Sequence, residues 1–327
     1  MTFYIITMIL GFTGFIVTSI IRQKKQEGQP LVCPINSHCD AVVHSSYSTF
    51  FGIDITLFGK CYYGIIVLLY AALLAIPQLV PEFFHSAGFF LSLFAVIFSA
   101  YLTIVQFVVI REWCLWCLGS AALSVGILVS TALGFDGLSL LLFQYESGIS
   151  IVLFLATALG VGSVLVSDSF FVYFLQDGRI SYSESRVLNL LSQITWFALS
   201  IIVLAIIGLI IPYSIDFIYY RPDFIILLIV LGVIVVNNVL LNLLVNPKIV
   251  DISFSNETEL VNHDYDHLRK FSFAFTFVSL VSWIFLCVFL VVLNKFGAPS
   301  VTSWLVGYGI SIVVSVLISQ YLEYRSF

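Results

Sequence analysis

The sequence predicts an all-α protein that crosses a membrane many times. Of its 327 residues, 61% are hydrophobic and only 9% are charged, whereas soluble domains have about 25% charged residues. The mean hydropathy is +1.10. The hydrophobic residues are gathered in segments of about 20, the length that a helix needs to cross a bilayer. Backbone groups in lipid must pair within their own segment, which favours helices over open strands.

Nine such segments can be delimited. The first, residues 2–21, has no basic residues ahead of it and no small-residue cleavage site after it, so we expect a retained helix and not a signal peptide. A glycine-containing linker follows Gly134, and we place a domain boundary there. We expect four helices in residues 1–140 and about five in residues 141–327. The predicted spans are 3–21, 60–80, 84–110, 114–134, 149–175, 188–211, 224–245, 271–294 and 298–321.

The charged residues exclude one class of partner and predict an orientation. The net charge is −5, and no basic face is available for nucleic acid. Nine alternating spans place 11 of the 13 Lys and Arg residues on one side, because only Arg221 and Lys295 fall on the other. The positive-inside rule assigns the basic side to the cytoplasm.

Two cysteines open the fourth predicted span. Cys114 and Cys117 are spaced i, i+3, so they share one face of a helix. The N–H groups and the dipole at a helix N-terminus favour a thiolate, and Arg111 lies three residues upstream. A thiol of lowered pKa is what thiol–disulfide exchange requires.

A second cysteine pair precedes the second span on the same predicted side. Five residues, including Pro34, separate Cys33 from Cys39, so the loop between them can close a disulfide or open it. A mobile pair near a fixed pair suggests a relay between a soluble partner and the membrane. The alternative is a zinc site, although the spacing of this pair does not suit one. For Cys61 and Cys287 we expect packing roles.

At these residues the first 140 positions resemble the vitamin K epoxide reductase (VKOR) family, especially its prokaryotic members. Besides the two cysteine pairs, the resemblance is carried by short motifs in the same order along the chain. These motifs are Ser45-Ser46-Tyr47, Phe51-Gly52, Leu57-Phe58-Gly59, Ser99-x-Tyr101-Leu102 with Gln106, and Cys114-Leu115-Trp116-Cys117.

The resemblance implies a quinone-dependent oxidoreductase built on a four-helix bundle. A separate thioredoxin-like protein would reduce the loop pair at Cys33, Cys39 would exchange with Cys114, and Cys117 would face a quinone of the ubiquinone or menaquinone type. The implied quinone contacts are Ser45, Phe51, Phe58, Tyr101 and Gln106. The resemblance would also put the site on the periplasmic side of the membrane, against the charge rule.

Two departures from the animal members bear on the substrate. Those members carry an asparagine before the second helix and a tyrosine after the second active-site cysteine. Here these places hold Ile55 and Ala121. This favours quinone reduction coupled to disulfide formation over reduction of vitamin K epoxide.

The second half carries no motif that identifies it. Asp168 lies within a predicted span, where an ionisable residue suggests a functional site. His263 and His267, spaced i, i+4, suit metal ligands on one helix face. The alternative function is therefore a metal-binding or transport protein with a redox-regulatory cysteine domain. A group of asparagines in the seventh span suggests hydrogen bonds between helices: Asn237, Asn238, Asn242 and Asn246.

Overall fold

The all-α, multi-pass architecture is confirmed. The computed structural model describes residues 1–29, 31, 33, 39–78, 80–81, 83–135, 137–175, 182–213, 222–241, 260–296 and 300–326. Within these ranges, eight helices are long and apolar enough to cross a membrane. The predicted span 224–245 is described only as the shorter apolar helix Phe224–Val239. Its end lies outside the described residues.

The chain forms two compact units. One comprises Met1–Ser147 with Ile207–Pro212, and the other comprises Gly148–Ile206 with Tyr213–Phe327. That residues 1–140 and 141–327 have separate roles stays a prediction.

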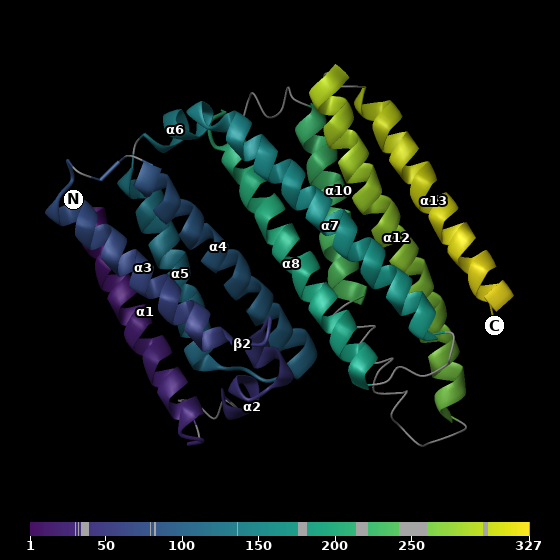
Figure 1. Cartoon of the computed structure of the whole chain (residues 1–327), viewed down its shortest axis with the longest axis horizontal. Helices are drawn as coiled ribbons and strands as arrows, with labels where there is room; N and C mark the ends of the chain where they lie inside the picture. Colours follow the sequence, from purple (N-terminus) through teal and green to yellow (C-terminus); the bar gives the residue numbers. More distant parts are fainter. Residues whose placement is uncertain are drawn as a thin grey trace. The chain divides into compact units, whose positions relative to one another are not determined.

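The first unit is a bundle of four long helices (Figure 1). Helix α1 packs against α3 and α5, and α4 packs against α5. Helix α4 ends in a π-helical turn, η2, and the short helix α6 follows α5. The bounds are Thr2–Gln26 (α1), Ile55–Ala75 (α3), Phe83–Val105 (α4), Gln106–Ile110 (η2), Leu115–Gly134 (α5) and Leu138–Gln144 (α6).

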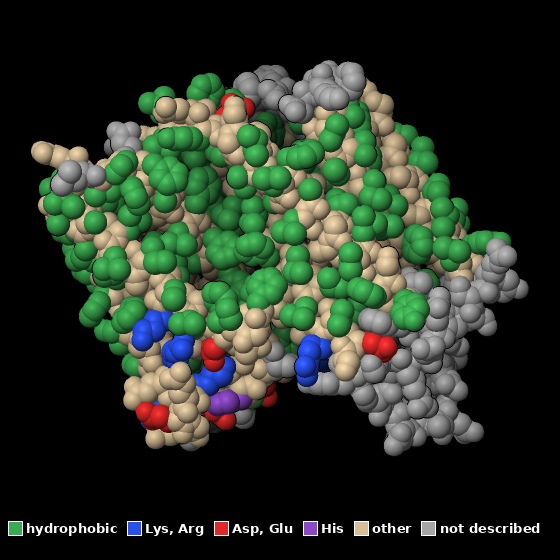
Figure 2. All heavy atoms as spheres, in the orientation of Figure 1, with side chains coloured by type: hydrophobic (Ala, Val, Ile, Leu, Met, Phe, Trp, Pro, Cys, Tyr) green, Lys and Arg blue, Asp and Glu red, His purple; other side chains and the backbone are tan. Residues whose placement is uncertain are grey.

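A short segment between α1 and α3 covers one end of this bundle. It contains helix α2 (Cys39–Val43), the 3₁₀ turn η1 (Ser46–Ser48) and strands β1 (Thr49–Phe50) and β2 (Ile53–Asp54). The strands are antiparallel. Figure 2 shows charged side chains gathered at this end, whereas hydrophobic side chains cover the sides of the helices.

An ion pair fastens this covering segment to α1. Lys25 Nζ lies 2.7 Å from Asp54 Oδ2, and Asp54 also caps α3 by accepting from the Thr56 N–H at 2.8 Å. Partial burial acts to raise the pKa of Asp54, but the hydrogen bonds from Lys25 and Thr56 outweigh it and lower the pKa. Asp54 therefore stays ionised and holds the start of α3 against the end of α1.

In the second unit the described residues form five helices, of which α10 is the shortest. Helix α12 packs against α10 and α13. The amide of Asn237 on α10 donates to the Phe275 carbonyl on α12 at 3.0 Å, as expected of an asparagine that joins two helices. The bounds are Glu146–Leu175 (α7), Tyr182–Ile210 (α8), Pro222–Val239 (α10), Leu260–Phe296 (α12) and Val301–Ser326 (α13).

Several predictions for the second half can be located on these helices. Asp168 on α7 has one carboxyl oxygen that is buried and has no hydrogen-bond partner within the described ranges. His263 and His267 lie on α12, but their side chains are outside what the structure describes, as are Asn242 and Asn246. Helix α12 begins at Leu260, before the predicted span 271–294, but its membrane-crossing part, Lys270–Leu293, agrees with that span.

Candidate active site

All four cysteines of the predicted relay lie in one packed group, which we call the cysteine cluster. Cys33 and Cys39 form a disulfide with their Cα atoms 5.9 Å apart, while Cys114 and Cys117 are thiols. Cys39 and Cys114 are buried in the cluster at 1% and 0% exposure, with Cys33 and Cys117 at its edge. The other members are Val17, Ile21, Leu31, Val42, Val43, Ile110 and Trp116.

Cys114 is the N-terminal cap of α5. Its Sγ accepts a hydrogen bond from the Cys117 N–H at 3.4 Å, in the place of the oxygen of an ordinary capping residue. The Cys117 thiol, with the N–H groups of Cys117 and Trp116, lowers the pKa of Cys114, although burial acts in the opposite direction. Arg111, which was also expected to lower the pKa of Cys114, does not contribute to this shift.

A tight turn brings Cys114 into this position. Helix α4 ends in the π-turn η2, and Arg111 then adopts a left-handed conformation with φ +57°. The turn brings the Cys114 N–H to the side chain of Gln106, whose Oε1 accepts it at 3.3 Å. π-Helical turns are frequent at functional sites, and here the turn connects two of the residues predicted for the site.

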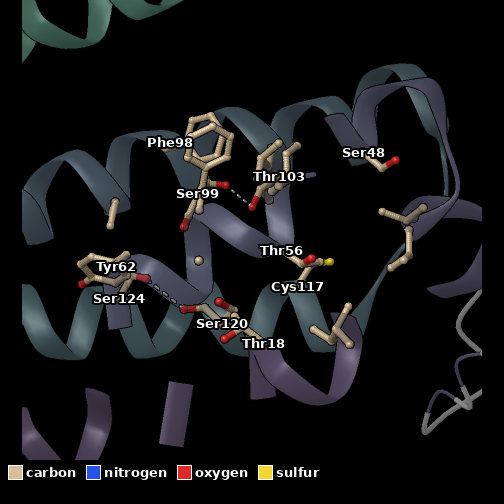
Figure 3. Close-up of a pocket in the computed structure, with 18 of the residues that line it drawn as sticks. Thr18, Ser48, Thr56, Tyr62, Phe98, Ser99, Thr103, Cys117, Ser120 and Ser124 are labelled. Carbon is tan, nitrogen blue, oxygen red and sulfur yellow. Dashed lines mark hydrogen bonds between the residues drawn. The ribbon is translucent and has the colours of Figure 1, made fainter. Parts of the chain in front are cut away.

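A cavity of about 330 Å³ lies beside the cysteine cluster (Figure 3). Of the four relay cysteines, only Cys117 lines it. Its walls come from α1, α3, α4 and α5 and from the covering segment, and they are mainly hydrophobic, with hydroxyl groups at intervals. This volume and character are typical of sites for small, largely apolar ligands.

Three of the five predicted quinone contacts line the cavity: Ser45, Phe58 and Gln106. The other two do not. Phe51 lies in the turn between β1 and β2, with φ +51°, and is exposed. Tyr101 is two residues, or about 200°, around α4 from Ser99, which does line the cavity. Phe51 and Tyr101 therefore do not line this cavity, and their contact with a quinone stays a prediction.

Several other polar residues line the cavity, and the motifs in the sequence did not single them out. Ser120 and Ser124 follow Cys117 at i+3 and i+7 on α5, and Thr103 lies between Ser99 on α4 and Gln106 at the start of η2. That spacing marks one face of a helix, so the signal was present in the sequence. Thr18 on α1 and Tyr62 on α3 carried no such signal.

The cavity reaches the exposed side of α3. Phe58, Cys61 and Ile65 line it and are also exposed. The packing role expected for Cys61 is therefore wrong. Cys287 is partly buried on α12, in keeping with packing.

The residues around the cavity fit a quinone. The hydrophobic walls suit its ring and tail, the Cys117 thiol is available for electron transfer, and the Tyr62 hydroxyl is buried without a hydrogen-bond partner in the described part of the chain. No group of three or more His, Cys, Asp or Glu side chains that could hold a metal ion occurs among the residues that the structure describes.

The resemblance to a known family is confirmed for the first unit. The model of the vitamin K epoxide reductase family matches residues 5–132, which include all four relay cysteines. This family indicates a membrane oxidoreductase that acts on thiols and is associated with quinones. The comparisons with curated proteins and with solved structures give no match.

Proposed function

We propose, from the family match over residues 5–132, that the chain is a quinone-dependent thiol–disulfide oxidoreductase that oxidises a separate thioredoxin-like protein. One observation carries the proposal. The two cysteine pairs pack in one cluster, and of the four sulfurs only that of Cys117 reaches an apolar cavity. Electrons can therefore pass from a soluble partner to the membrane through cysteines alone.

The first exchange takes place at the loop pair. Cys33 is only partly buried, whereas Cys39 is sealed inside the cluster, so a thiolate of the partner attacks the Cys33 sulfur. The Cys33–Cys39 bond breaks, a bond between the partner and Cys33 forms, and Cys39 leaves as a thiolate. The second thiol of the partner then displaces Cys33, which completes the partner's disulfide.

The second exchange carries the electrons to the fixed pair. Cys39 attacks Cys114 when Cys114 and Cys117 are disulfide-bonded, and Cys117 leaves as a thiolate. Cys33 then attacks Cys39, which restores the loop disulfide and releases Cys114. The lowered pKa of Cys114 makes it a good leaving group in that last step. Both pairs return to the states in which the structure shows them.

The fixed pair is reoxidised at the cavity. When bound, a quinone supplies an acceptor for two electrons and two protons. Cys117 and Cys114 lose these and join as a disulfide, so each turnover oxidises one partner dithiol. Gln106, Ser45 and Phe58 would hold the ring beside Cys117. The hydrophobic Ile55 in the lining supports quinone as the substrate over vitamin K epoxide.

The test uses the purified full chain, a short-chain ubiquinone and a reduced thioredoxin-like protein. We expect quinone reduction with the intact partner. With a partner that lacks its second cysteine, we expect a near-stoichiometric mixed disulfide on Cys33, located by peptide mass spectrometry. The Cys33→Ala chain is the control and should form no adduct. Absence of quinone reduction, or an adduct on Cys39, would contradict the proposal.

We also propose that the cysteine cluster faces the cytoplasm. The support is the excess of Lys and Arg on that side of the predicted topology. In intact cells, an impermeant maleimide should leave Cys33 unlabelled after mild reduction and should label it once the membrane is opened. Labelling of Cys33 from outside intact cells would refute this orientation and favour the periplasmic one.

A further inference from the structure

The hydrogen-bond donors of the cavity are mostly engaged already. Six hydroxyl groups in its lining donate to oxygens of the chain itself. Ser45, for example, donates to the Val42 carbonyl at 2.8 Å and so presents lone pairs, not a proton, to the cavity. A ligand with carbonyl oxygens, such as a quinone, instead needs hydrogen-bond donors from the cavity walls. The six pairs are Thr18 to Gly14, Ser45 to Val42, Thr56 to Asp54, Tyr63 to Ser120, Thr103 to Ser99 and Ser124 to Ser120.

Gln106 differs from these hydroxyls. A backbone N–H requires an acceptor, so the amide end that meets Cys114 must be Oε1. This fixes Nε2 at the other end. No described residue is hydrogen-bonded to Nε2, and Gln106 is one of the residues that line the cavity. Gln106 itself is only 4% exposed, so the residues packed around it restrict the movement of the amide.

We infer that the Gln106 amide couples the cavity to the redox pair: Nε2 donates to a carbonyl oxygen of the bound quinone while Oε1 holds the Cys114 N–H. This inference rests on the proposed function and adds a link within it. The family resemblance offered Gln106 as a ligand contact only. Gln106 thereby becomes a positioning residue for Cys114.

The coupling follows from the polarity of an amide. An acceptor at Nε2 polarises the group, and this makes Oε1 a stronger acceptor for the Cys114 N–H. A firmer bond there fixes the backbone of Cys114 as the cap of α5, with Sγ against the Cys117 N–H. A bound quinone then favours the thiolate of Cys114. Within the cysteine cluster, the other titratable group is Cys117, because Cys33 and Cys39 are joined as a disulfide.

The test separates the two ends of the amide. Gln106→Glu in its ionised form keeps an oxygen for the Cys114 N–H but cannot donate to the quinone, and Gln106→Leu loses both bonds. Thr13→Val is the control, because Thr13 lies on α1 outside the cavity lining and bonds only the Ile9 carbonyl in the described structure. Two quantities are measured: the quinone KM against kcat, and the pH midpoint of Cys114 alkylation by iodoacetamide. The alkylation uses a Cys117→Ser background, with and without decylubiquinone.

We expect the quinone to lower the alkylation midpoint when Gln106 is present and to leave it unmoved in Gln106→Glu and Gln106→Leu. In both variants the quinone KM should rise about 5-fold, which corresponds to one hydrogen bond of about 1 kcal/mol. In Gln106→Leu, kcat should also fall, because Cys114 loses its anchor. Thr13→Val should show the KM and the midpoint shift of the unmodified chain.

Two results would overturn the inference. One is an alkylation midpoint of Cys114 that the quinone does not change when Gln106 is present. The other is a quinone-induced shift of that midpoint that is equally large in Gln106→Leu. Neither result would contradict the proposed function, as long as the chain with Gln106 still reduces quinone. Failure of that chain to turn over would instead remove the proposed function itself.

Discussion

Replacing Cys117 by alanine is expected to lower quinone reduction by the chain more than about 1000-fold, as loss of a covalent nucleophile does in other enzymes. Of the four relay cysteines, Cys117 alone lines the cavity, and no other relay sulfur is placed to replace it. The steps at the loop pair do not need Cys117. The variant should therefore still oxidise one equivalent of a reduced thioredoxin-like protein through the Cys33–Cys39 disulfide and then stop.

The control is the pair of cysteines outside the relay. Cys61→Ala and Cys287→Ala should keep turnover within about 2-fold of the unmodified chain, since surface and small hydrophobic changes have small effects. Cys61 is the sharper control because it lines the same cavity. Steady turnover in Cys117→Ala, measured as quinone absorbance loss under anaerobic conditions, would refute the relay. Loss of turnover in Cys61→Ala would show that Cys61 is also needed for electron transfer to the quinone.

Much of the site could be predicted from local patterns. Hydrophobic segments of the length of a bilayer predict the helices, and the spacing of Cys114 and Cys117 places both at the start of α5. An even number of spans between the two pairs brings them to the same end of the bundle. The shared cluster of Cys39 and Cys114 agrees with that parity.

The remaining details depend on backbone geometry that no local pattern encodes. The bond from Cys114 to Gln106 requires both the π-turn and the left-handed Arg111, because a regular helix would carry Cys114 away from Gln106. Phe51 and Tyr101 belong to motifs of the family resemblance, but a motif does not state which side of a turn or helix a ring occupies. Thr18 enters the cavity only because α1 packs against α3.

That packing of α1 on α3 gives the second large expected effect. Gly14→Val should destabilise the first unit by about 3 kcal/mol, the upper part of the range for overpacked cores. A Cβ at Gly14 would overlap the ring of Tyr63. The ring cannot move aside, because it is 1% exposed and its hydroxyl bonds the Ser120 carbonyl at 2.7 Å and Ser124 at 3.1 Å.

The effect should reach the cavity as well as the fold, because Tyr63, Ser120 and Ser124 all line it. We expect Gly14→Val to lower the midpoint of heat-induced aggregation in detergent by about 5–10 °C and to weaken quinone binding at temperatures where the chain is still folded. Gly119→Val on α5 is the matched control, since nothing lies within 4 Å of its added Cβ. Equal midpoints in the two variants would mean that α1 and α3 do not pack at Gly14. A lowered midpoint with unchanged quinone KM would mean that the cavity does not depend on the position of Tyr63.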